Sequence, residues 1–182
     1  RTGRLAPLTA AVIVALGFAV VIGVGMAGLM ASAGATGTEA AVVGGQYAST
    51  SLAAIGLAAL TAQVATTARL ANLIAVAVVI GGYVVRGAGD ASGWEWLRWT
   101  NPVGWAQQMD PFGANSWWPA LLCVAFFATT VAAAAWASGH RDLGGGLITP
   151  APGPPSSTVS SVAGLIVRLH RGAFLGWLVG IG

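Results

Sequence analysis

The sequence has no lysine, one cysteine and few charged residues of either sign. Asp, Glu, Lys and Arg make up 7% of the residues, whereas a soluble domain carries about a quarter of its residues in these types. Hydrophobic residues make up 56% of the chain, and the mean hydropathy is +0.78. So little charge cannot cover a water-facing surface. The sequence therefore predicts that lipid surrounds most of this chain.

Other absences exclude classes of function. The phosphate-binding loop GxxxxGK[ST] needs a lysine, so the chain cannot hold ATP in such a loop. Cys123 has no second cysteine for a disulfide, and His140 and His170 lack companion ligands at metal-site spacing. No nucleophile and base stand at a recognisable spacing, and the basic residues are scattered. We therefore expect no enzyme activity, no bound cofactor or metal, and no nucleic-acid partner.

Four apolar stretches dominate what is present. A helix crosses a bilayer core of about 30 Å with roughly 20 apolar residues, and the spans expected on this basis are residues 5–30, 40–65, 70–86 and 117–138. An interruption at residues 87–116 separates the last two. The predicted fold class is an all-α integral membrane protein: a polytopic transmembrane helix bundle with short re-entrant or interfacial helices in the interruption.

The interruption is rich in tryptophan and is broken by two prolines, Pro102 and Pro111. Each proline disfavours helix at the residue before it, so only short helices fit between them. Backbone that re-enters a membrane is tolerated only where protein buries it or water reaches it. This region is therefore expected to cap a pathway or to pack on a partner. Arg86 and Asp90 stand four residues apart and can form an ion pair on a helix, the alternative being a solvated helix end.

Loop charges predict the orientation in the membrane. With four spans, one side carries Arg1, Arg69 and Arg141, and the other carries most of the acidic residues. The positive-inside rule places the arginine side in the cytoplasm and the interruption outside. Residues 148–158 are rich in proline and predict a cytoplasmic linker. Residues 159–182 predict an interfacial helix and the start of a further span, so we expect the chain to be part of a longer polypeptide.

The second span is more polar than the others and has two interpretations. Small residues at helical spacing allow neighbouring helices to approach closely, and they are Ser49, Ala53, Gly56 and Ala59. Polar residues can instead face a cavity, because unpaired polar groups in lipid are costly. The residues expected on such a translocation path are Gln46, Tyr47 and Gln63.

Several motifs occur in a fixed order along the chain. They are VVRGAGD, NPVGWAQQMDPF, WWPALL, RDLGGGL and, after the proline-rich stretch, RLHRGAFLGW. In these motifs, and in GRLAPL and LTAQVATTARLAN, the chain resembles the permease subunits of type-2 ATP-binding-cassette exporters of the polyketide-antibiotic and multidrug group. Family members usually have SPxGW where this chain has Asn101-Pro102. Because asparagine also caps helices, we expect the turn to survive.

The resemblance implies a bacterial cytoplasmic-membrane protein that exports amphipathic, drug-like small molecules. It implies four kinds of partner: an ATP-binding-cassette ATPase subunit acting as a dimer, the other transmembrane half of the same permease, the lipid bilayer and the small-molecule substrate. ATP and Mg would be bound by the ATPase subunit and not by this chain. The permease itself would therefore not be an enzyme.

The broken, Trp-rich region is the expected outer gate. Its hinge is expected to be Arg86 with Asp90, and its gate residues are expected to be Trp99, Pro102, Trp105, Gln107, Asp110 and Phe112. Two other functions remain as alternatives. A gradient-driven secondary transporter predicts an ionisable residue deep within a span. A non-transporting membrane scaffold subunit predicts no ATPase partner.

Overall fold

The structure, a computed structural model, describes residues 5–139. Over this range the helices are α1 (Ala6–Ser32), α2 (Gly37–Val64), α3 (Ala68–Ser92), the 3₁₀ helix η1 (Glu95–Thr100), α4 (Pro102–Gln107) and α5 (Trp118–Gly139). Helices α1, α2, α3 and α5 are long and apolar enough to cross a membrane. The two short helices lie between the third and fourth of them. The predicted fold class is therefore confirmed.

Side-chain caps explain where two of the long helices begin. At the start of α2, the Thr36 hydroxyl accepts from the Glu39 N–H at 3.3 Å, and the Thr36 N–H donates to the Glu39 carboxylate at 2.7 Å. This reciprocal pair satisfies two N–H groups that no helical carbonyl reaches. At the start of α3, the Thr67 hydroxyl accepts from the Leu70 N–H at 3.2 Å. Both helices consequently begin two or three residues before the expected spans.

Helix α3 extends beyond the span that the sequence predicts. The third span is expected to end at Arg86, and the helix itself continues to Ser92. Residues 87–92 contain no proline to stop it, and Arg86 pairs with Asp90 one turn later. The helix ends where Gly93 adopts a φ of 74°, a conformation that glycine takes without steric cost. The interruption is thus residues 93–117, which we call the Trp-rich segment.

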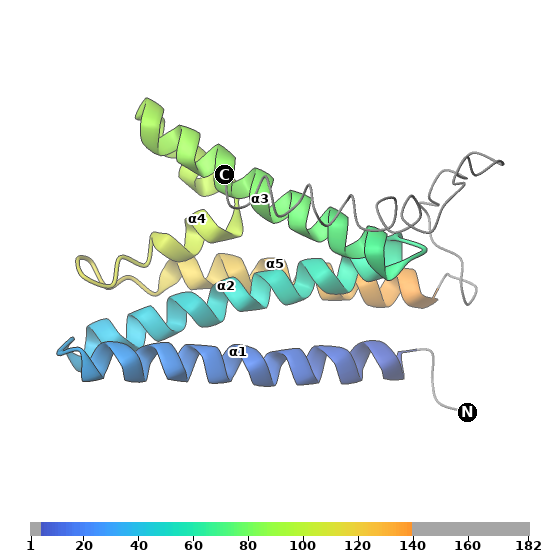
Figure 1. The fold of residues 1–182 in the computed structure, drawn as a ribbon, viewed down its shortest axis with the longest axis horizontal. Coiled ribbons are helices and arrows are strands. Elements are labelled where there is room, and N and C mark those ends of the chain that lie inside the picture. The colour runs from blue at the N-terminus through green and yellow to red at the C-terminus, as the bar shows by residue number, and fades with distance from the viewer. Residues whose placement is uncertain (1–4, 140–182) are drawn as a thin grey trace, which may run out of the picture. The chain divides into compact units, whose positions relative to one another are not determined.

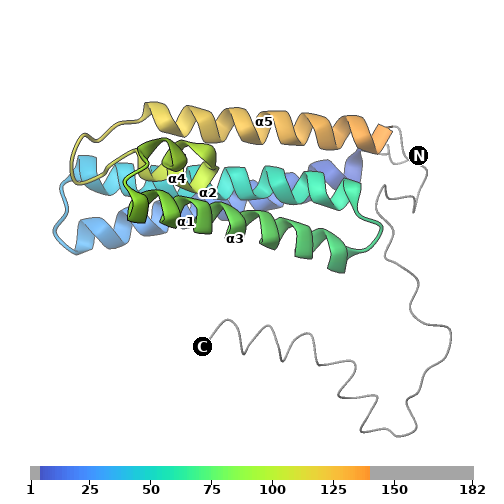
Figure 2. The ribbon, with the colours of Figure 1, turned by 90° about the horizontal axis from the view of Figure 1, so that it is seen from above.

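Helix α2 is the centre of the described bundle, because it contacts α1, α3, α4 and α5. Figure 1 shows α1 beside α2, with α3 inclined to both. In the view of Figure 2, α4 lies between α5 and α3. The α1–α2 turn and the Trp-rich segment lie at one end of these helices, and the α2–α3 turn lies at the other (Figure 1). This arrangement separates Glu39 and Asp90 from Arg69, in agreement with the loop charges.

Small residues allow the neighbours of α2 to approach its backbone closely. A Cβ on Gly44 would lie 2.6 Å from the carbonyl oxygen of Gly23 in α1, and a Cβ on Gly56 would lie 3.0 Å from the Cα of Phe127 in α5. The four small residues identified in the sequence, Ser49, Ala53, Gly56 and Ala59, are all buried. The packing interpretation of this pattern is therefore confirmed, and it matches the preference of membrane helices for small residues at their contacts.

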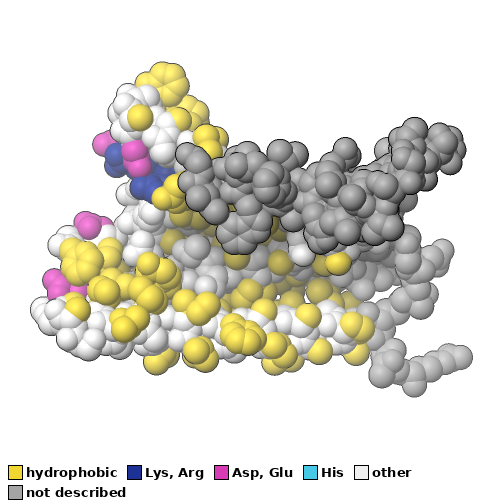
Figure 3. Space-filling view, in the orientation of Figure 1, with side chains coloured by type: hydrophobic (Ala, Val, Ile, Leu, Met, Phe, Trp, Pro, Cys, Tyr) yellow, Lys and Arg dark blue, Asp and Glu magenta, His cyan; other side chains and the backbone are white. Residues whose placement is uncertain are grey.

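The outer faces of the long helices are apolar. Large hydrophobic side chains are exposed along α1 and α3, among them Ile13, Phe18, Leu73 and Val84. Figure 3 shows hydrophobic side chains along α1, whereas the Asp, Glu and Arg side chains in view gather at one end. An apolar surface of this extent requires lipid or further helices as its surroundings.

The contact between α1 and α2 can be tested by substituting Gly44. In Gly44→Ala, the new methyl group would overlap the Gly23 carbonyl and the Ala27 side chain, and we expect the overpacking to destabilise the permease by about 1–3 kcal/mol. Thermal unfolding of the full-length permease in nanodiscs measures this effect. The matched control is Gly25→Ala on α1, where the added methyl meets no atom within 4 Å. Equal unfolding temperatures for the two variants would contradict the close contact.

Candidate functional site

The Trp-rich segment re-enters the helix bundle after leaving the end of α3. It is bonded to α3 by Asn101, whose Nδ2 donates to the Gly82 carbonyl oxygen at 3.0 Å. Gly82 lies ten residues before the end of α3, which is about 15 Å along a helix that rises 1.5 Å per residue. The chain therefore turns back along α3 through η1, reverses at Asn101, and returns through α4 toward the start of α5.

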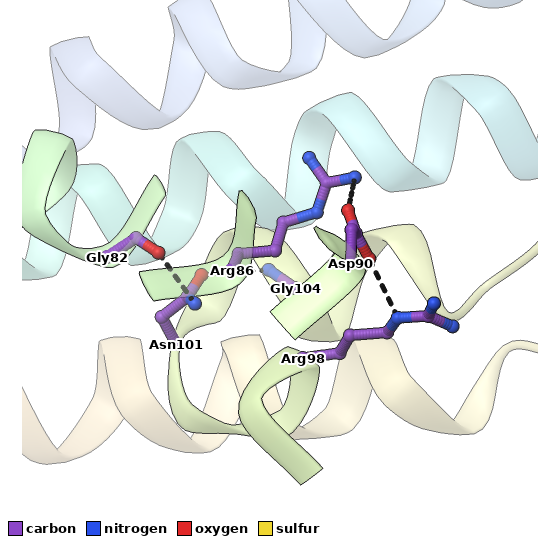
Figure 4. A network of polar contacts seen from close by, with 6 residues as sticks. All are labelled: Gly82, Arg86, Asp90, Arg98, Asn101 and Gly104. Carbon is purple, nitrogen blue, oxygen red and sulfur yellow. Dashed lines mark hydrogen bonds and ion pairs between the residues drawn. The ribbon is translucent and has the colours of Figure 1, made fainter. Parts of the chain in front are cut away.

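Asn101 holds the point of reversal with both ends of its side-chain amide (Figure 4). Its backbone is extended, with φ −147° and ψ 155°, as expected for a residue before proline. Its Oδ1 accepts from the Gly104 N–H at 2.9 Å and so caps α4. The expectation that asparagine keeps the cap is confirmed. The bond to Gly82 was not predicted from the sequence, although the Asn101 amide has donor hydrogens on Nδ2 as well as the capping acceptor Oδ1.

Asp90 joins the end of α3 to η1 through two ion pairs (Figure 4). Its Oδ2 lies 2.9 Å from Arg86 Nη2, and its Oδ1 lies 2.8 Å from Arg98 Nε. The pair with Arg86 was predicted from spacing. The pair with Arg98 was not predicted, because the turn at Gly93, and not helical spacing, brings Arg98 next to Asp90. These side chains are 23–38% exposed, so each pair stabilises by only about 0–1 kcal/mol and chiefly fixes geometry.

Two tryptophans connect the segment to α5. Trp99 stacks on Trp118 with ring centroids 5.0 Å apart and planes 14° from parallel. The Trp105 indole packs edge-on against Phe126 at 6.1 Å, and its Nε1–H donates to the Trp99 carbonyl oxygen at 2.5 Å. The structure therefore brings Trp99, Pro102 and Trp105 together at the reversal. The two indole rings form a contact between η1, α4 and α5 rather than a simple belt at the membrane surface.

The far end of the segment is anchored on α2. Met109 is fully buried, and its sulfur accepts from the Ser49 hydroxyl at 3.7 Å. The next residue, Asp110, shapes the following turn with a φ of 45°, and its Oδ2 accepts from the Ala114 N–H at 2.9 Å. The Asp110 side chain is thus hydrogen-bonded to the backbone of its own turn.

The remaining predicted residues do not join this cluster. Gln107 is half-buried on α4, and Phe112 is 67% exposed on the turn. On α2, Gln46 and Gln63 are 17 residues apart, which separates them by about 25 Å along the helix. Tyr47 is 46% exposed beside Gln46, whereas Gln63 lines a groove of about 560 Å³ between α1 and α2. The three path candidates therefore do not converge on one site.

Among residues 5–139, no three His, Cys, Asp or Glu side chains come together as a metal site would require. His140, His170, the proline-rich residues 148–158 and residues 159–182 lie outside the described part of the chain. Cys123 is buried in α5, where its thiol lies 3.5 Å from the Pro102 carbonyl oxygen.

The four long apolar helices and the re-entrant segment define a multi-pass α-helical membrane protein. Over 98% of its length the chain is 35% identical to the multidrug efflux system permease protein Rv1217c of Mycobacterium tuberculosis. The aligned region is 33% of that relative, so the chain spans about a third of its length. No protein-family model matches the chain. This similarity to a permease agrees with the resemblance that the motifs indicated.

Substitution of Asn101 tests how the reversal is held. Asn101→Ala removes the cap, worth about 0.5–2 kcal/mol, and leaves the Gly82 carbonyl without this donor, so we expect faster amide exchange in residues 102–107. Asn101→Ser keeps a capping oxygen and should exchange at an intermediate rate. Hydrogen exchange of the full-length permease in nanodiscs measures both. Asn72→Ala, at an exposed position of α3, is the control, and exchange equal to this control in both variants would contradict the assignment.

Proposed function

We propose that this chain forms part of the permease of an ATP-driven exporter, in which the Trp-rich segment is the outer gate. The exported molecules are amphipathic and drug-like, and they leave through the bacterial cytoplasmic membrane. The observation that carries the proposal is the reversal at Asn101, which sets non-helical backbone about 15 Å back from the end of a long apolar helix. Irregular backbone at such a depth is tolerated where it lines a cavity or is buried in protein.

Two further observations support export by a complex. The relative that this chain resembles is named a multidrug efflux permease, and the chain covers only a third of it. The rest of the pathway would come from the other transmembrane half. The chain has no lysine for a phosphate-binding loop, so ATP and Mg would be held by a separate ATP-binding-cassette subunit, acting as a dimer.

The positions of the charges favour ATP as the energy source over an ion gradient. Gradient-driven transporters place ionisable residues deep within spans. In residues 5–139, the charged residues of the long helices lie near helix ends. Glu39 and Arg69 are in the first turns of α2 and α3, and Arg86 and Asp90 are in the last two turns of α3.

The ties of the segment suggest how such a gate would respond. Asn101 and Asp90 tie it to α3, Trp99 ties it to α5, and Met109 ties it to α2. A relative movement of these three helices would therefore displace the segment. Nucleotide binding on the partner subunit shifts such an equilibrium only through different affinities for the two states.

Energy coupling is tested by reconstituting the full-length permease with the ATPase subunit that co-purifies with it. We expect vesicles to accumulate an amphipathic fluorescent dye when ATP is supplied, and a protonophore should leave the rate unchanged. Loss of transport with the protonophore, while ATP remains, would establish the gradient-driven alternative. Failure of any ATPase to co-purify, together with no transport, would establish the scaffold alternative.

The gate assignment is tested with Trp105→Ala and Asp110→Ala. The first removes the indole donor and the contact with Phe126, and the second removes the acceptor for the Ala114 N–H. A change of about 1.4 kcal/mol in the equilibrium between gate states alters their populations tenfold, so we expect dye efflux to fall by about tenfold. Phe18→Ala, on the exposed face of α1, controls for loss of an aromatic side chain. Unchanged efflux and ATPase stimulation at normal membrane abundance would exclude a gate role.

A further inference from the structure

A cavity of about 270 Å³ lies directly against the reversal of the Trp-rich segment. Four elements enclose it: α2, α3, α5 and the segment itself. The lining residues that matter here are Thr50 and Leu57 of α2, Val79 and Gly82 of α3, Asn101 of the segment and Phe126 of α5. None of the path residues expected from the sequence lines this cavity.

The polar groups of the lining are already committed elsewhere. The Thr50 hydroxyl donates to the Gln46 carbonyl oxygen at 2.9 Å, and the Thr100 hydroxyl donates to the Leu97 carbonyl oxygen at 2.7 Å. The Asn101 amide is occupied by its two backbone bonds. Both hydroxyl hydrogens are therefore used, and apart from Thr50, Thr100 and Asn101 every lining residue is apolar, so the lining offers little to a buried water, which needs two to four polar partners. The cavity therefore suits an apolar occupant.

Size and shape restrict that occupant. An apolar cavity of about 150 Å³ takes one benzene, whereas pockets for drug-sized molecules measure roughly 300–1,000 Å³. The volume of this cavity lies between those values, and the lining residues Thr50 and Leu57 stand about 10 Å apart along α2. The cavity therefore suits a slender apolar group.

The wall formed by α3 is open on the outer face of the described bundle. Val78 and Val79 both line the cavity, yet they are 51% and 44% exposed. They belong to the apolar outer face of α3, which lipid or another helix must cover. Where lipid covers this face, an alkyl chain dissolved in the bilayer reaches the cavity from the side, without crossing the polar end of the bundle.

We propose that this cavity binds a single alkyl chain of an amphiphile dissolved in the bilayer. The alkyl chain lies against Asn101 and Pro102. Its presence in the cavity therefore supports the backbone where the Trp-rich segment reverses. The alkyl chain comes either from a membrane phospholipid or from a free single-chain amphiphile. This binding site does not depend on the energy source or on the proposed export function.

Photolabelling of the full-length permease in phosphatidylcholine nanodiscs tests the site. One probe is a phosphatidylcholine with a diazirine on its acyl chain, and the other is a free fatty acid with the same group. Mass spectrometry should map adducts to residues 50–57 and 100–103. Val79→Trp fills the cavity and should reduce labelling there by about tenfold, because a filled space admits no chain. Val76→Trp, on the same exposed helix but outside the lining, should leave labelling unchanged.

Val78→Trp, a second filling variant at an exposed position, keeps the test valid if Val79→Trp does not fold. Labelling by both probes assigns the site to phospholipid chains, and labelling by the fatty acid alone assigns it to free amphiphiles. The proposal is overturned if neither probe labels residues 50–57 and 100–103 more strongly than the exposed face of α1. It is also overturned if both filling variants label as the wild type does. Dye efflux, measured in parallel, reports the proposed function separately.

Discussion

The small residues of α2 are the constraint on which the described fold depends. Gly44 allows the backbone of α1 to approach closely, and Gly56 does the same for α5. Ser49 contacts the buried sulfur of Met109. In lipid, helices gain little from hydrophobic burial against one another, and close packing must hold them together. A larger residue at any of these positions would move a whole neighbour. One helix therefore sets the position of the bundle and of the Trp-rich segment.

The Trp-rich segment is possible because its polar groups find partners within the protein. Membrane-embedded backbone cannot rely on water, so a break between two spans needs substitute donors and acceptors. Asn101 supplies both at the reversal, and Trp105 donates to the carbonyl of Trp99. Asp90 adds two exposed ion pairs that contribute little free energy but fix η1 against α3. The segment is thus held by many small interactions on three helices, as the proposed gate would require.

Much of this organisation could be predicted from residues alone. The lack of charge indicated lipid, the lengths of the apolar runs indicated four spans, and the prolines marked the breaks between short helices. The cap at Asn101 and the Arg86–Asp90 pair followed from local spacing. Helix α3 continues past Arg86, the expected boundary of the span, because an arginine beside a span does not end a helix. A helix stops at a residue that breaks it, here Gly93, and not at a change in polarity.

Sequence by itself determined what is local or cumulative: the membrane as solvent, the helical class, the sites of interruption and the separation of charge between the two ends. Tertiary structure alone decided which distant residues meet. Arg98 reaches Asp90, Asn101 reaches Gly82, and an apolar cavity lies beside them. These contacts depend on how deeply the segment re-enters. That depth follows from the packing of four helices, which neither periodicity nor spacing encodes.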